Sequence, residues 1–341
     1  RFTEGMVGPS AELPATLGIS TPSSNNSDLR TKGWEVSIGW KDRLKNGLGY
    51  GINLSLSDQI TMIDSYPDNK TLSIDSYLPG YKDGLIWGYE TIGIAKSDEE
   101  MQAHLASLPK GGQDAVGSQW AAGDIMYKDL NGDGKISEGA RTLGDHGDLK
   151  ILGDTYSHYF FGIDLNADWK GFDFRAFFQG VLKHDYWGSG NFTGMLFGVR
   201  GGYSRWHTRG FKQHEDYFRA EPAGLEGHEL PANLDSYYPR PIFSDSSDGT
   251  SFGAKNQKVQ SRYVQDASYI RLKNLQFGYT LPAKFTNKFG INRLRIFVSG
   301  ENVWTGTGLT KLFDPETISG GNGGNAYPLS RTWSFGLSLT L

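Results

Sequence analysis

The segment that decides the fold runs from residue 159 to residue 169 and reads YFFGIDLNADW. Its odd-numbered positions are all apolar, whereas from Gly162 onward its even-numbered positions are small or polar. Two residues, Lys170 and Gly171, follow before the alternation resumes at Phe172. Because the side chains of a β-strand point alternately to opposite faces, this pattern predicts a two-faced strand with a tight turn into the next.

The same period of two recurs elsewhere and predicts seven strands in all. They cover residues 34–40, 48–57, 158–169, 172–186, 268–281, 294–304 and 332–341. Several reach the length of about 9–11 residues that a tilted strand needs to cross a bilayer. Aromatic residues such as Trp34, Trp169 and Trp304 lie near strand ends, as in the interfacial girdles of membrane barrels. A soluble β-sandwich alternates for the same physical reason, so alternation by itself leaves both classes open.

The lengths of the links favour the membrane class. Short or intermediate links (41–47, 170–171 and 282–293) take turns with long ones (58–157, 187–267 and 305–331). In an up-and-down meander every second link lies on the same side, which is the arrangement of outer-membrane barrels. A Greek-key sandwich gives no reason for such sorting. We therefore predict an all-β fold that contributes the C-terminal strands of a large antiparallel transmembrane β-barrel, with long outer loops that contain short helices.

An odd number of strands cannot close an antiparallel ring, and bacterial single-chain barrels use even numbers. An open sheet in lipid would leave backbone groups unsatisfied at several kcal/mol each. We therefore expect residues 1–341 to be part of one barrel domain, with the remaining strands upstream of Arg1. The polar, small residues of the inner face favour a wide barrel with an aqueous or plugged lumen.

Composition excludes several classes of protein. The chain has 341 residues, 46 of them Gly, with 13% aromatic residues and 34 basic against 38 acidic residues, a net charge of −4. These values argue against a coiled coil, a disordered chain and a basic nucleic-acid binder. No run of 18 apolar residues predicts a membrane-spanning helix. Cysteine is absent, so there is no disulfide framework.

Signals for catalysis are weak. The sequence GTSFG at residues 249–253 matches a nucleophile-elbow pattern by letter, but it lies in a Gly/Ser-rich loop without the strand–turn–helix context. The seven histidines show no metal-ligand spacing such as HExxH. We therefore predict that the protein is not an enzyme.

The first long loop carries two local motifs. Ser97 followed by Glu100 forms a capping box, and the apolar residues after it predict a short helix. The second motif, at residues 129–136, matches a calcium loop, with oxygen ligands at positions 1, 3, 5 and 7: Asp129, Asn131, Asp133 and the backbone carbonyl of Lys135. It predicts a structural Ca²⁺ ion.

The calcium motif is incomplete. Its twelfth position is Ala140 where a bidentate Glu is usual, and Glu138, Asp145 and Asp148 are candidate substitutes. The alternative is an Asx-rich surface turn that binds no metal.

Several motifs, taken in order, resemble one known family. The stretch 123–136 (GDIMYKDLNGDGKI) resembles a signature of SusC-type (SusC/RagA) TonB-dependent outer-membrane transporters of Bacteroidota. The remaining motifs are similar to strand and hairpin signatures of the same family: TKGWE at 31–35, KGFD at 170–173, FFQG at 177–180, YIRLKN at 269–274, SGEN at 299–302, DPE at 314–316 and YP at 327–328. The resemblance runs from about residue 14 to 341.

The resemblance implies a 22-stranded barrel in the bacterial outer membrane, in contact with lipid, with an N-terminal plug that this chain lacks. It also implies a SusD-like surface lipoprotein as partner, TonB as the energy-coupling partner through the plug, and an oligosaccharide or peptide as ligand. No nucleic acid is expected. The family usually ends on an aromatic residue, whereas this chain ends on Leu341.

Two other functions remain open from the sequence. A passive outer-membrane porin would need neither plug nor energy coupling. A soluble, Ca²⁺-stabilised glycan-binding β protein would be extracted without detergent. The soluble alternative requires the apolar strand faces, including Phe161, Leu165, Phe174 and Leu337, to pack against a second layer of the same chain.

Overall fold

The computed structural model describes residues 1–9, 23–188, 211–242, 254–318 and 327–341. The GTSFG sequence at 249–253 lies outside these residues. By its internal contacts the chain divides into two compact units. Unit 1 comprises residues 1–30, 61–155 and 186–264, and unit 2 comprises residues 31–60, 156–185 and 265–341. No helix of the described residues is long and apolar enough to span a membrane.

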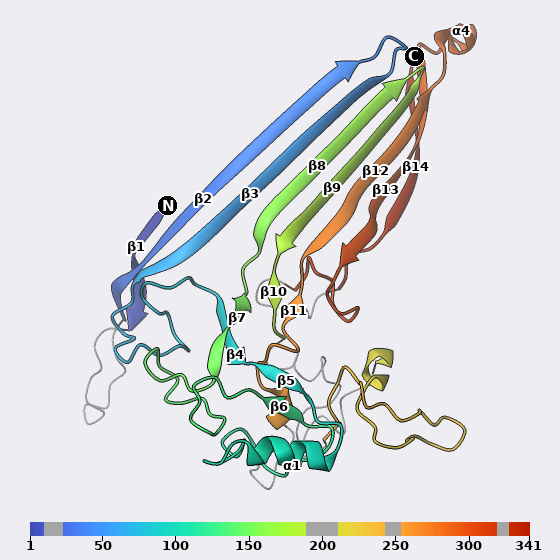
Figure 1. Ribbon diagram of the computed structural model, residues 1–341. Coiled ribbons are helices and arrows are strands. Elements are labelled where there is room, and N and C mark those ends of the chain that lie inside the picture. The colour runs from blue at the N-terminus through green and yellow to red at the C-terminus, as the bar shows by residue number, and fades with distance from the viewer. Residues whose placement is uncertain (10–22, 189–210, 243–253, 319–326) are drawn as a thin grey trace. The chain divides into compact units, whose positions relative to one another are not determined.

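An antiparallel sheet is the main element of the described residues (Figure 1). Its strands, in spatial order, are β1 (Phe2–Pro9), β2 (Ser23–Arg43), β3 (Gly49–Ser65), β8 (His158–Trp169), β9 (Phe172–Lys183), β12 (Tyr269–Thr280), β13 (Arg293–Thr307) and β14 (Thr332–Thr340). Spatial order follows sequence order, so the sheet is a meander. Short links therefore lie at one end of the strands and long links at the other, as the sequence predicts.

The register places apolar residues beside apolar residues. One row across the sheet joins Tyr50, Ala167, Phe174, Phe277, Val298 and Phe335. Large apolar side chains on this face are exposed, for example Trp40 at 63%, Leu337 at 63% and Phe335 at 86% of their surface. Water would penalise such a surface by about 25 cal/mol per Å² of apolar area. The face therefore requires an apolar environment.

The opposite face is polar. The next row along the strands joins Gly51, Asn166, Arg175, Gln276, Ser299 and Ser334. Cross-strand ion pairs lie on this face: Arg175 with Asp164 at 2.7 Å, and Arg295 with Asp173. At Gly278 a Cβ atom would lie 2.3 Å from the Asp173 carboxylate and 2.5 Å from the Arg295 guanidinium, so a larger residue would displace the ends of these two side chains.

The strands differ in detail from the sequence prediction. β2 begins at Ser23, 11 residues before the alternation that predicts it, and pairs there with β1, for which no strand is predicted. The strand predicted to end at residue 186 ends at Lys183, and a separate short strand, β10 (Asp185–Tyr186), follows. Short helical turns, α4 (Ala283–Thr286) and η5 (Asn287–Phe289), occupy the link between β12 and β13.

Unit 1 has its own hydrophobic core. Tyr127, Ile125 and Met101 are fully buried in it. Outside the main sheet its described elements are β4 (Leu85–Tyr89), β5 (Thr91–Ile94), α1 (Asp98–Ala106), β6 (Ile125–Tyr127), β7 (Leu149–Asp154), η2 (Lys212–Glu215) and η4 (Lys255–Gln257). β4 pairs with β7 and β5 with β6. A further short strand of the described residues is β11 (Gln265–Asp266).

The predicted N-cap at Ser97 forms at the start of α1, but the return bond of the capping box is shifted by one residue. The Ser97 hydroxyl accepts a hydrogen bond from the backbone N–H of Glu100 at 3.2 Å. The Glu100 carboxylate accepts from the N–H of Lys96, one residue before the cap, at 2.6 Å. Met101 and Leu108 are buried in the core of unit 1, so the apolar stripe of the helix serves local packing.

Candidate functional site

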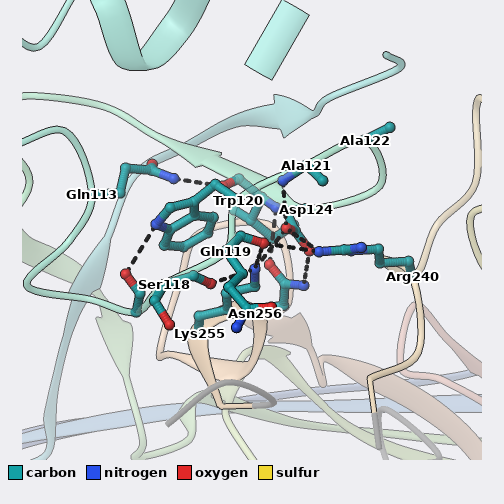
Figure 2. A network of polar contacts seen from close by, with 12 residues as sticks. Gln113, Ser118, Gln119, Trp120, Ala121, Ala122, Asp124, Arg240, Lys255 and Asn256 are labelled. Atoms are coloured by element: carbon teal, nitrogen blue, oxygen red, sulfur yellow. Dashed lines mark hydrogen bonds and ion pairs between the residues drawn. The ribbon is translucent and has the colours of Figure 1, made fainter. Parts of the chain in front are cut away.

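The long links between strands fold into a packed assembly in unit 1, and a buried carboxylate lies at its centre. Asp124, just before β6, has no exposed surface. Figure 2 shows how Arg240, Lys255 and Asn256 converge on it from segments more than 100 residues away in the chain. The network therefore fastens three distant parts of the loops to one another.

Five hydrogen bonds saturate the Asp124 carboxylate. Arg240 donates two, both 2.8 Å long, from Nε and Nη2 in a fork that matches the carboxylate. Lys255 Nζ donates one at 2.7 Å and Asn256 Nδ2 one at 2.8 Å. The backbone N–H of Ala121 donates the fifth at 2.9 Å. A carboxylate with this many donors is a stable anchor rather than a reactive group.

Lys255 is the most unusual member of the network, because its side chain is fully buried. Besides Asp124 its ammonium donates to the carbonyl oxygens of Ser118 and Gln119, and it lies 4.6 Å from the centre of the Trp120 ring. Burial lowers the pKa of Lys255, and the hydrogen bond to Asp124 opposes this change. Its three hydrogen bonds and the aromatic ring replace the water it loses.

Neutral side chains extend the network to the strands beside it. The Tyr127 hydroxyl donates to the backbone carbonyl of Lys255 at 2.6 Å. Gln113 is fully buried; it accepts from the N–H of Tyr127 at 2.6 Å and donates to the carbonyl of Ile125 at 3.1 Å. Burial raises the pKa of Tyr127 well above its usual range, so it stays a neutral hydrogen-bond donor.

The motif at 129–136 forms a tight turn held by its own side chains. The Asp129 carboxylate accepts from the N–H groups of Gly132 at 2.7 Å and Gly134 at 2.9 Å. Asn131 accepts from the N–H of Asp133, and Asp133 from that of Lys135. Gly134 adopts a positive φ of 79°, which glycine tolerates best. The oxygen atoms named by the sequence thus lie on one compact turn.

Of the three acidic candidates for completing the motif, Asp148 contacts the turn directly. It is fully buried and accepts from the N–H of Leu130 at 2.8 Å and from that of Ser137 at 2.8 Å. Burial raises the pKa of Asp148, although these backbone donors act in the opposite direction. Asp145 instead accepts from the N–H of Ala140, and Glu138 pairs with Arg141 at 2.6 Å.

Among the described residues no group of three or more His, Asp or Glu residues is placed so that it could hold a metal ion. The backbone hydrogen bonds also give the Asx residues a structural role that needs no metal. The predicted calcium site at Asp129, Asn131, Asp133 and Lys135 therefore stays a prediction.

A surface cavity of about 390 Å³ lies elsewhere in unit 1 and is lined by three aromatic side chains, Tyr66, Tyr77 and Trp87. Tyr66 and Tyr77 meet edge to face at 5.3 Å. Asn69, which is buried, donates to the carbonyls of Ser73 and Tyr77 and fixes this loop. The nearby Asp83 charge, together with burial, raises the pKa of Tyr77.

Three charged residues also line this cavity, Asp75, Lys82 and Asp83. Arg141 forms a salt bridge with Asp75 and lowers its pKa. A cavity lined by both aromatic and charged side chains suits a flat ligand with polar groups, such as a sugar ring or a peptide side chain.

Sequence reasoning finds some of these residues and misses others. The stretch 123–136 draws attention to Asp124 and to the turn at Asp129. Lys255, Asn256 and Arg240 carry no local signal, since their partner is remote in sequence. The structure shows that the segment around Arg240 anchors its loop, with Tyr238 buried in the core and Arg240 bound to Asp124.

The chain is similar to TonB-dependent receptors. TonB-dependent receptor P3 of Formosa agariphila is 27% identical over 361 aligned positions, which cover 99% of this chain and 31% of that receptor. TonB-dependent receptor P26 of the same organism is 25% identical over 96% of this chain and 31% of its own length. This chain thus spans about a third of the length of these relatives. No protein-family model matches it.

The fold is that of a solved transporter. The RagAB peptide transporter superposes with a TM-score of 0.62 at 18% identity, covering 99% of this chain and 32% of that chain. The same importer in its open-open state gives a TM-score of 0.59. The resemblance to TonB-dependent transporters and the antiparallel barrel fold predicted from the sequence are therefore confirmed, and the sheet is open in this chain. The relatives are receptors rather than enzymes.

Proposed function

We propose that the chain is part of an outer-membrane, TonB-dependent active importer of oligosaccharides or peptides that works with a SusD-like surface lipoprotein. The observation that supports the proposal most is the two-faced sheet, in which exposed apolar rows oppose polar rows with ion pairs. Lipid on one side and a wet lumen on the other satisfy both faces. The aromatic cavity at Tyr66, Tyr77 and Trp87 supports ligand contact in the loops.

Uptake of two labelled probes tests the proposal. Cells that carry the full-length protein and its neighbouring lipoprotein gene receive a fluorescent oligosaccharide mixture or a fluorescent peptide mixture. Active import predicts accumulation of one probe that stops when TonB is deleted or a protonophore is added. A passive porin would admit the probe equally well without TonB. Uptake that persists after deletion of the lipoprotein gene would contradict the lipoprotein partnership alone.

We also propose that the turn at residues 129–136 binds a structural Ca²⁺ ion. The alternating oxygen ligands and the buried Asp148 beside them support this proposal. Asp129→Ala combined with Asp133→Ala should remove bound calcium and raise the hydrogen-exchange rate of residues 129–148. The matched control, Asp114→Ala with Asp216→Ala, removes the same charge elsewhere in unit 1. Unchanged calcium content and unchanged exchange in the double variant at 129 and 133 would refute the site.

A further inference from the structure

The link after β13 folds back onto the polar face of the sheet in unit 2. Leu309, Phe313 and Ile318 are buried there, which anchors the link. Arg271 of β12 pairs in register with Gln179 and Thr305 on this face. Its guanidinium donates to Thr305 Oγ1 at 2.9 Å, and its side chain is only 3% exposed.

Two acidic side chains of the link accept hydrogen bonds from cations of β12. Asp314 accepts from Arg271 at 2.7 Å and from the N–H of Leu329 at 3.1 Å. Glu316 accepts from Arg271 at 2.8 Å and from Lys273 at 2.8 Å. Burial disfavours ionisation of Asp314, but the N–H of Glu316 and the Arg271 guanidinium hold its pKa below the usual value.

A cavity of about 350 Å³ lies between this link and the strands, within the usual size range of small-ligand sites. Asp314 joins its two walls, because it binds Arg271 on one side and the Leu329 backbone on the other. Asn302 of β13 also donates to the carbonyl of Ser330 at 3.1 Å, which fixes the segment that carries Arg331. The cavity is therefore built before any ligand arrives.

The cavity carries an excess of positive charge. Three cations line it, Arg271, Lys311 and Arg331, against one acid, Asp314, an excess of 3 − 1 = +2. Asp314 is already paired with Arg271. Lys311 and Arg331 line the cavity and form no ion pair with any other described residue. Residues 319–326, which lie between Lys311 and Arg331 in the sequence, include no charged residue.

We propose that this cavity binds the carboxylate of a ligand between Lys311 and Arg331. An arginine fork and an ammonium are the donors that recognise a carboxylate in proteins. The carboxylate can come from a uronic-acid sugar or from the C-terminus of a peptide. Binding is an equilibrium property of this site and does not depend on the importer function proposed above.

Calorimetry on the full-length protein in detergent, at low ionic strength, tests the site with two pairs of probes. The pairs are digalacturonate with its neutral dimethyl ester, and N-acetyl-dialanine with its C-terminal amide. At least one acid should bind tenfold or more tightly than its neutral partner, and the preferred acid identifies the source. Added salt should weaken binding of the acid, because the charges lie near solvent.

Charge variants locate the effect. Lys311→Gln with Arg331→Gln should abolish the preference for the acid. Lys284→Gln with Lys288→Gln, which removes two exposed cations from the link between β12 and β13, should keep it. If the first double variant fails to fold, the single variant Lys311→Gln replaces it, and its affinity for the preferred acid should fall about tenfold. Equal binding of acids and neutral partners, or a preference that survives in the Lys311 and Arg331 variants, would overturn the proposal.

Discussion

At the scale of single residues, Lys255 is a fully buried cation in the described loops. An isolated buried ammonium is strongly disfavoured in a medium of low polarity. Here an anion, two carbonyl oxygens and an indole ring surround it. The arrangement is stable only when residues 118–124 and 255 are together, so it makes the loop assembly depend on its complete set of segments.

Lys255→Met should therefore open the loop assembly. The variant removes one donor each from the Ser118 carbonyl, the Gln119 carbonyl and the buried Asp124 carboxylate, at a cost of about 3–5 kcal/mol. Hydrogen exchange of residues 113–127 in the full-length protein measures the loss. Lys258→Met is the matched control, because the Lys258 side chain is partly exposed and its salt bridge with Glu138 is long, at 3.5 Å. Its effect should stay below about 0.5 kcal/mol, and equal effects of both variants would contradict the role of Lys255.

The two faces of β12 give a second prediction at this scale. Phe277 lies on the apolar face and is 48% exposed, whereas its neighbour Gln276 lies on the polar face. Phe277→Arg should destabilise the folded barrel by about 2–4 kcal/mol, because a charge on the lipid side must leave water. Gln276→Arg should be tolerated, and Phe277→Leu should separate loss of the ring from the added charge. Heat-dependent gel mobility of the full-length protein reports the folded fraction, and equal mobility of both arginine variants would count against a lipid-facing surface.

Residues of this kind differ in how well the sequence reveals them. The faces of Phe277 and Gln276 follow from local alternation, which is a property of neighbouring positions. The Asp129 carboxylate is also part of a local pattern, since it accepts from the N–H groups of Gly132 and Gly134. The Lys255–Asp124 pair joins positions 131 residues apart, and no local pattern in a single sequence links two such distant positions. Lysine is also among the residues least often buried, so the residue type at position 255 predicts an exposed side chain.

At the scale of elements, tight turns set the register of the long strands. Lys170 and Gly171 join β8 to β9 with φ angles of 47° and 91°, as a two-residue hairpin of the primed type requires. The sequence predicts this hairpin because both strands alternate right up to the turn. It does not predict the pairing of β4 with β7, since their partners, such as Tyr89 and Leu149, are remote and each strand is too short to show a period.

Gly171→Ala should impair formation of this hairpin. The left-handed conformation costs a residue with a Cβ about 1–2 kcal/mol, and that Cβ would lie 2.7 Å from the carbonyl oxygen of Thr280. Gly47→Ala is the control in the link between β2 and β3. Gly47 has a similar φ of 87°, but a Cβ there meets nothing within 4 Å. The folded fraction should fall further for Gly171→Ala than for Gly47→Ala, and the reverse order would show that crowding at Thr280 is unimportant.

At the scale of the whole molecule, the sheet has two edge strands that each pair on one side only among the described residues. β14 pairs with β13 but with no other described strand, and β1 pairs only with β2. Unpaired N–H and C=O groups are costly in lipid, at several kcal/mol for each group. The chain spans about a third of the length of the receptor relatives it matches.

Residues 1–341 expressed alone should therefore fail to give a heat-modifiable barrel in outer membranes. Expressed together with a second polypeptide that carries the rest of the full-length protein, they should assemble, because the two edges then pair and every strand backbone is satisfied. The control is a version that ends at Arg331 and lacks β14. It should not assemble with or without the second polypeptide, because the loss of β14 leaves β13 unpaired at one edge. A folded barrel from residues 1–341 alone would mean that the edge strands β1 and β14 pair with each other or with further copies of the chain. Cross-linking between cysteines introduced into β1 and β14 would then distinguish pairing within one chain from pairing between copies.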